Sequence, residues 1–161
     1  MNHLNSAHQA KAGRYLTFVL KGRPYGLPID TVRGINQVNE ITPVPQTPEF
    51  VIGVINLRGK VIPVVDLRLK FGLEYTPYNR ETCIIVIEGE HGQIGMVVDQ
   101  VSEVVDFIEE NIEASPQMGE KMNFVLGMGK VDERVIILID IVSALSKEAM
   151  LGQKLIAGAQ L

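Results

Sequence analysis

The sequence predicts an all-β protein of two linked five-stranded β-barrels, followed by a short C-terminal helix. Three observations support this fold class. Short apolar runs rich in Val and Ile recur along the chain. Gly, Pro and charged residues separate these runs, and part of the pattern occurs twice. A chain of 161 residues has room for two small barrels that share a core, and for little more.

Ten apolar runs have the length and composition of β-strands. β-branched residues bounded by turn residues are typical of strands, and glycine-rich segments such as 22–26 and 89–93 predict hairpin loops. The segment 66–72 can form one helical turn, and "SALSKEAM", with Ser143 as its N-cap, favours the C-terminal helix. The expected strands are 15–20, 25–29, 31–38, 50–57, 60–67, 82–88, 93–99, 101–107, 124–131 and 134–141.

The repeated pattern divides the chain into two similar halves of five strands each. The motif G-x-x-x-D-x-V-x-x-I begins at Gly26 and returns, with a final Val, 69 residues later at Gly95. A second set recurs 74 residues further on: Gly53, Val61, Ile62, Asp66 and Leu67 become Gly127, Val135, Ile136, Asp140 and Ile141. Each half is too small to bury enough apolar surface for stability alone, so we expect the two barrels to pack together. The seam between them should form a groove lined by Val and Ile.

Composition and charge restrict the partners. The net charge is −4, and the chain shows no basic stripe, which argues against nucleic acid and against anionic lipid. Aromatic residues make up 6% with no Trp, too few for a base-stacking platform. The polar residues 1–14 predict a disordered tail and contain no apolar secretory signal. No run approaches the ~20 apolar residues of a membrane span. We therefore expect a cytoplasmic protein that does not insert into a membrane.

The sequence contains no recognisable catalytic or metal-binding motif. It lacks metal-ligand spacings, a nucleophile elbow and a phosphate-binding loop, so we expect no cofactor, no metal and no enzyme activity. Four aspartates that end apolar strands could be paired catalytic carboxylates. Because they are related by the repeat, a structural role is favoured, in which each caps a turn with an Asx hydrogen bond. These are Asp30, Asp66, Asp99 and Asp140. A ligand-binding or catalytic barrel that uses the groove between the barrels is the alternative.

The segment "NLRGK" contains the strongest candidate for partner recognition. A hairpin turn accounts for Gly59, because glycine adopts positive φ without strain. It does not account for Arg58, which apolar strands flank on both sides. A guanidinium offers five donors in a planar fork, suited to carboxylates and helix-terminal carbonyls. We expect Arg58 at the edge of the groove; a simple exposed turn residue is the other interpretation.

One long string resembles the signature of the CheW family, the coupling proteins of bacterial chemotaxis. It is "GVINLRGKVIPVVDLRLKFGL", with "YGLPIDTVRGI" before it and "IGMVVDQVSEV" after it in the family's order and spacing. The resemblance runs from about Tyr15 to Met150. It implies one CheW-like domain over 15–150, made of two interleaved SH3-like barrels, with 151–161 as a tail or helix extension.

The same resemblance implies a non-enzymatic adaptor without a cofactor. CheW-like proteins join the cytoplasmic hairpin tip of chemoreceptors to the regulatory domain, itself CheW-like, of the histidine kinase CheA. A helical receptor tip would dock by helix-in-groove recognition. The resemblance thus implies a cytoplasmic protein recruited to membrane-associated receptor arrays.

The resemblance also implies which residues bind partners. Arg58 matches the family arginine implicated in receptor and kinase coupling, and two glycines match the same string. Four valines match apolar positions at or near the groove, and for each of them core packing is an equally open role. The glycines are Gly53 and Gly59, and the valines are Val32, Val98, Val101 and Val104.

One segment departs from the family pattern. Many members carry V-x-E-I where this chain has Val32, Arg33, Gly34 and Ile35. Gly34 replaces the usual acid, so a charge-assisted contact is missing beside Ile35. A paralogue that serves another receptor cluster, or another chemosensory output, is therefore an alternative.

Overall fold

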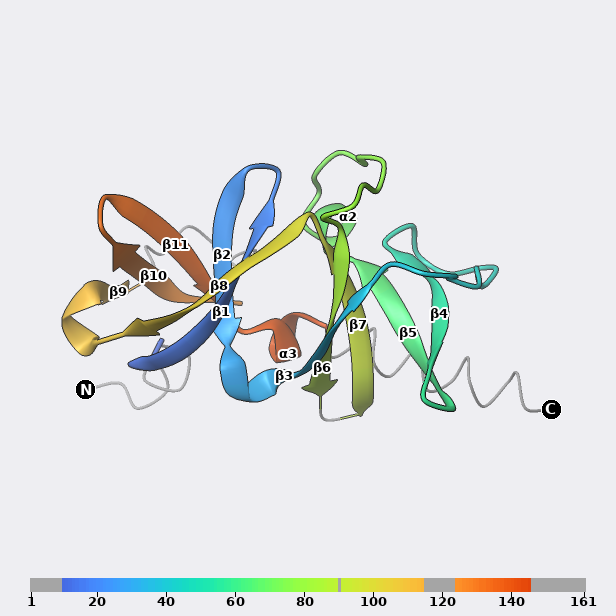
Figure 1. Cartoon of the computed structure of the whole chain (residues 1–161), viewed down its shortest axis with the longest axis horizontal. Coiled ribbons are helices and arrows are strands. Elements are labelled where there is room, and N and C mark those ends of the chain that lie inside the picture. Colours follow the sequence, from blue (N-terminus) through green and yellow to red (C-terminus); the bar gives the residue numbers. More distant parts are fainter. Residues whose placement is uncertain (1–9, 90, 115–123, 146–161) are drawn as a thin grey trace.

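The computed structural model describes residues 10–89, 91–114 and 124–145. Within these ranges the chain forms two β-sheets that lie next to each other along the long axis of the molecule (Figure 1). The short helices are η1 (Ile29–Thr31), α2 (Leu67–Lys70), η2 (Glu109–Asn111) and α3 (Ile141–Ala144). The strands are β1 (Gly13–Leu20), β2 (Arg23–Pro28), β3 (Val32–Gln37), β4 (Val51–Leu57), β5 (Lys60–Asp66), β6 (Cys83–Gly89), β7 (Gly92–Val98), β8 (Gln100–Phe107), β9 (Ile112–Ala114), β10 (Val125–Val131) and β11 (Arg134–Ile139).

The predicted all-β class and the short C-terminal helix are confirmed, and each predicted run contains a strand. Sheet A has the strand order β8-β1-β2-β11-β10-β9, and sheet B has the order β3-β6-β7-β5-β4. Sheet A therefore has six strands where we expected five. The extra strand, β9, has three residues and is too short to show an alternating pattern in the sequence. At the corresponding edge of sheet B, a single bridge joins Thr42 to Val54.

Each sheet is built from both halves of the repeat. Sheet A combines β1 and β2 of the first half with β8, β10 and β11 of the second, and sheet B combines β6 and β7 with β3, β4 and β5. A parallel pair joins the two contributions in each sheet, β2 with β11 and β7 with β5. Gly26 pairs with Leu138, and Gly95 pairs with Val64. The two pairs are equivalent, because the offset of 69 relates the glycines and the offset of 74 relates their partners. The chain thus crosses from one sheet to the other after β2 and after β7.

One large apolar core contains residues of both sheets. It includes Leu16 and Phe18 of β1 together with Ile85 of β6 and Met96 of β7. Each sheet also has a smaller core of its own, because successive side chains of a strand point to opposite faces. Full burial of one such side chain contributes about 1.5–3 kcal/mol, so the shared core holds the two sheets together.

Two expectations at the chain ends need correction. The side chain of Asp140 caps α3 and accepts hydrogen bonds from the backbone N–H of Ser143 at 3.1 Å and from its hydroxyl at 2.7 Å. Ser143 is therefore inside the helix and is not its N-cap, and the predicted continuation over 146–150 lies outside the described residues.

The N-terminal boundary also differs. The expected tail included Gly13 and Arg14, but both pair with β8 as the first residues of β1. Ladder hydrogen bonds use the backbone, so polar side chains do not prevent this pairing. Residues 1–9 and the predicted tail 151–161 lie outside the described residues. In the described part of the chain, no helix is long and apolar enough to cross a membrane.

Candidate protein-interaction site

The turn between β4 and β5 consists of Arg58 and Gly59. Both have positive φ, 54° and 86°, the conformation of a type I′ hairpin turn. The Gly59 N–H donates to the side-chain oxygen of Asn56 at 2.9 Å. The turn role predicted for Gly59 is therefore confirmed. The turn conformation alone does not single out Arg58, because Lys21 has a φ of 51° in the β1–β2 turn.

The side chain of Arg58 projects into solvent at the tip of this hairpin. It is exposed and forms no hydrogen bond or ion pair within the described ranges 10–89, 91–114 and 124–145. Figure 1 shows β4 and β5 on the side of sheet B away from sheet A. Arg58 does not line the pocket described below. The β4–β5 turn thus lies away from the seam, so the expected position of Arg58 at the seam is wrong, while its role in partner binding stays a prediction.

Two of the predicted partner-binding residues are buried. The Val98 side chain is 0% exposed and belongs to the core shared by the sheets. Gly53 lies at a β-bulge with a φ of 150°, and a Cβ there would overlap the carbonyl oxygen of Thr42. Neither can touch a partner directly in this conformation. For Val98 core packing is the correct interpretation, and Gly53 allows the close approach of a neighbouring segment.

The other predicted apolar positions lie on β3 and β8. Val32 and Val101 are half-buried and pack against the shared core. The side chains of Ile35 and Val104 are 49% and 50% exposed. Gly34 is half-buried, and a Cβ there would find nearly open space.

These four apolar residues form two pairs that the repeat relates. Val32 corresponds to Val101, and Ile35 corresponds to Val104. Both strands are edge strands, each with a partner on one side only, and each begins near the place where the sheets meet (Figure 1). Exposed apolar side chains that occur twice at equivalent places are typical of an interaction surface. We name these four residues the β3/β8 surface.

We did not predict that a second pair of apolar residues related by the repeat is exposed. Val61 at the start of β5 is 43% exposed, and its repeat equivalent Val135 at the start of β11 is 51% exposed. Two features of the sequence could have predicted this pair. The two valines are related by the offset of 74 residues, and each lies next to a charged turn at the start of its strand.

Arg68 is a buried charged group held by several contacts, and sequence reasoning also missed it. Its side chain is 1% exposed and donates from Nε and Nη2 to the two carboxylate oxygens of Asp66, at 3.0 and 2.9 Å. Its Nη1 donates to Asp99 at 2.9 Å. The rings of Tyr78 and Tyr75 lie 5.2 and 5.7 Å from its Cζ. The hydrogen bond to Asp66, more than any other contact, raises the pKa of Arg68.

The four aspartates differ in what their side chains contact. Asp66 and Asp140 cap α2 and α3, as the repeat predicted. Asp99 instead binds Arg68 and the backbone N–H of Lys21, the latter at 2.7 Å. The side chain of Asp30 is exposed and has no hydrogen bond among the described residues. Capping is therefore the correct role for two of the four. No group of three or more potential metal ligands occurs in the described ranges.

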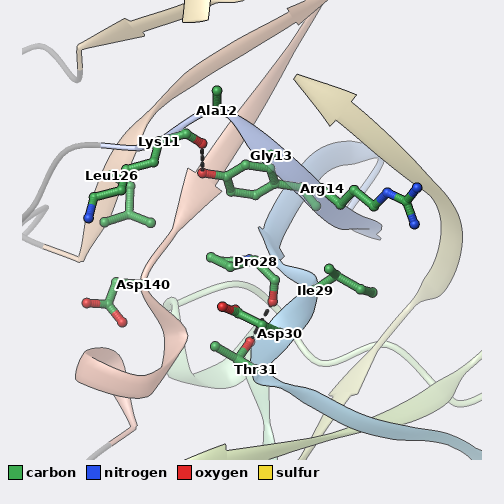
Figure 2. A pocket seen from close by; sticks show the side chains of 11 residues that line it. Lys11, Ala12, Gly13, Arg14, Pro28, Ile29, Asp30, Thr31, Leu126 and Asp140 are labelled. Atoms are coloured by element: carbon green, nitrogen blue, oxygen red, sulfur yellow. Dashed lines mark hydrogen bonds between the residues drawn. The ribbon is translucent and has the colours of Figure 1, made fainter. Parts of the chain in front are cut away.

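A pocket of about 450 Å³ lies on sheet A, apart from the β3/β8 surface. Figure 2 shows Asp30 and Asp140 on two sides of it, with Lys11 beyond. Tyr15 also lines the pocket. The Tyr15 hydroxyl donates to the carbonyl oxygen of Lys11 at 2.7 Å, and burial raises its pKa, so the phenol stays neutral. The pocket is lined by both of these carboxylates and by basic side chains, including that of Arg14.

The fold and these surfaces define a small all-β interaction module, with an exposed cation at a hairpin tip and apolar edge strands where two sheets meet. The model of one protein family, the CheW-like domain, matches residues 14–149. This match covers most of the chain, so the chain belongs to that family.

Individual relatives agree with this assignment. The chain is 36% identical over 138 residues to the chemotaxis protein CheW of Klebsiella aerogenes, covering 84% of this chain and 83% of that protein. It is 32% identical over 138 residues to the chemotaxis protein CheW of Bacillus subtilis, covering 84% and 88%. The crystal structure of the scaffolding protein TtCheW from Thermoanaerobacter tengcongensis matches with a TM-score of 0.78 at 36% identity, covering 83% of this chain and 92% of that chain.

Proposed function

We propose that this protein is a non-enzymatic adaptor of bacterial chemotaxis that couples chemoreceptors to the histidine kinase CheA. The observation that carries the proposal is the match to the CheW-like domain over residues 14–149, together with relatives named as chemotaxis and scaffolding proteins. The adaptor acts in the cytoplasm and is recruited to membrane-associated receptor arrays. It needs no cofactor for this role.

The β3/β8 surface is the proposed docking place for the cytoplasmic hairpin tip of a receptor. Ile35 and Val104 present apolar side chains that an amphipathic helix can cover. Gly34 beside Ile35 carries no charge where the family commonly has an acid, so apolar contact contributes more of the binding here. Val32 and Val101 pack against the shared core and so hold the strands that carry the two exposed residues in place.

Arg58 is proposed as a separate contact. Its exposed guanidinium can bind a carboxylate or helix-terminal carbonyls on the regulatory domain of CheA or on the receptor. Because Arg58 lies at the β4–β5 turn and not on β3 or β8, the two contacts can be tested independently.

The test measures binding to a receptor hairpin fragment and to the CheA regulatory domain, with folding of each variant checked by circular dichroism. Val104→Asp should weaken receptor binding by about tenfold or more, since a charge must be desolvated in an apolar contact. Ser102→Asp adds the same charge to the same strand at an exposed position and should stay within about twofold.

For the cation, Arg58→Ala should weaken binding to one of the two partners by about tenfold. Lys60→Ala removes an equal charge from the same hairpin and is the matched control. A wild-type chain that binds neither partner would refute the adaptor proposal. Unaltered binding and kinase control in Arg58→Ala would remove that residue from it.

A further inference from the structure

The chain passes from sheet B to sheet A over one residue. β7 ends at Val98 in sheet B, β8 begins at Gln100 in sheet A, and Asp99 lies between them. The position of this residue therefore decides where β8 starts. Its backbone N–H donates to the carbonyl oxygen of Val19 on β1 at 3.1 Å.

The carboxylate of Asp99 collects donors from both sheets. One oxygen accepts from the Arg68 side chain at 2.9 Å, on the helix that follows β5 of sheet B. The other accepts from the backbone N–H of Lys21 at 2.7 Å, in the β1–β2 turn of sheet A. Asp66 holds the opposite side of the guanidinium through two further bonds, so the planar group has no freedom to turn.

The repeat provides an internal comparison for this arrangement. Asp99 corresponds to Asp30, and Arg68 corresponds to Val142, which has no side-chain donor. Among the described residues, the other crossover, from β2 through η1 to β3, is therefore made without such an ion pair. The fold does not require the Arg68 contact in order to carry the chain from one sheet to the other. The contact distinguishes the crossover that leads into β8.

β8 contains a break in pairing that makes its first part sensitive to this anchor. The register between β1 and β8 shifts between Leu16 and Phe18, so Val101 pairs with Phe18 on one side of the shift and Val104 pairs with Leu16 on the other. The backbone ladder alone thus holds the start of β8 less firmly than a regular strand.

We propose that Arg68 is a positioning residue for partner binding: by holding Asp99, it fixes the start of β8 and so aligns Val101 and Val104 with β3 in the β3/β8 surface. This inference rests on the proposed adaptor function. Arg68 is buried and touches no partner itself. It acts through Asp99 on the strand that carries the exposed apolar residues.

The test compares Asp99→Asn with Asp30→Asn, the same change at the repeat-equivalent crossover. Asp99→Asn keeps a side-chain oxygen for the Lys21 N–H but removes the charge that Arg68 binds. It should speed hydrogen exchange of the β8 amides that pair with β1 by about tenfold and weaken binding of the receptor hairpin fragment by about tenfold. Asp30→Asn should stay within about twofold in both measurements, and Asp99→Glu, which restores the charge, within about threefold of wild type.

A control separates positioning from a general loss of stability. Ile84→Val, in the separate core of sheet B, should lower the melting temperature while leaving β8 exchange and receptor binding as in wild type. Wild-type β8 exchange in Asp99→Asn would overturn the inference. Faster exchange with unchanged affinity would also overturn it, because Arg68 would then be structural only. If wild type itself does not bind the hairpin, the proposed function fails, while the exchange measurement still decides whether Arg68 fixes β8.

Discussion

Replacing Arg68 with Met removes a cation from a place where water cannot substitute for it. The side chain of Arg68 is 1% exposed and that of Asp66 is 0% exposed. After the change, the Asp66 carboxylate retains two weaker donors, the backbone N–H at position 68 at 3.0 Å and the Tyr78 hydroxyl at 3.4 Å. A buried carboxylate without its counter-charge is strongly unfavourable.

The magnitude follows from the bonds that are lost. Two charged hydrogen bonds to Asp66 disappear, and each such bond contributes about 1.5–3 kcal/mol. The bond to Asp99 counts for less, because that carboxylate is 24% exposed and water can solvate it. The Met side chain recovers part of the loss through apolar contact. The expected destabilisation is about 3–5 kcal/mol, as for the removal of one partner from a buried pair.

Urea unfolding followed by circular dichroism measures this loss as a change in the free energy of unfolding. Lys60→Met removes an exposed cation as the control and should cost less than about 0.5 kcal/mol. The double variant Arg68→Met with Asp66→Asn should be more stable than Arg68→Met alone, because it also removes the unpaired charge. A loss below about 1 kcal/mol in Arg68→Met, the value of an exposed ion pair, would refute the buried network.

Three further changes test the fold and its charges. Gly53→Ala should cost about 3 kcal/mol in urea unfolding, because its Cβ would meet the backbone of Thr42; a loss under about 1 kcal/mol would contradict that close approach. Asp140→Ala should cost about 1 kcal/mol as the loss of an N-cap and should cost more than Ser143→Ala; equal losses would contradict the cap assignment. Burial raises the pKa of Tyr78 from 10.0 to about 12. Stability from this group is therefore complete below pH 10 and is lost as the pH rises toward 12; phenolate absorbance that titrates entirely near pH 10 would contradict it.

The sequence predicted those features that depend on neighbouring residues. Strands followed from short Val- and Ile-rich runs, and the caps at Asp66 and Asp140 followed from an Asx pattern whose acceptor and donor are two or three residues apart. The repeat predicted two similar halves, and in the structure Gly26 and Gly95 pair with equivalent strands. Such features are local, or are copied from one half to the other, so one chain is enough to see them.

The features that were missed depend on contacts between distant residues. Asp99 accepts hydrogen bonds from Arg68, 31 residues away in the sequence, and from Lys21, 78 residues away. No local sequence pattern indicates either contact. The prediction that Arg58 lies at the seam was wrong for a similar reason. The string around it is local, but its position relative to the seam depends on which edge of sheet B carries β4.

Strand exchange connects the fold to the proposed surface. β3 and β8 are the strands that follow the two crossovers, so each leaves the strands that precede it and pairs in the opposite sheet. Each therefore begins where the sheets meet, with one edge unpaired, and each carries one exposed apolar residue at the same repeat position. A duplicated half that kept its own strands would place these residues at the outer ends of two separate sheets. Because the halves exchange strands, β3 and β8 both begin at the seam, each with one exposed apolar residue. The buried Arg68 at the crossover into β8 can then control the position of β8 and of its exposed residue.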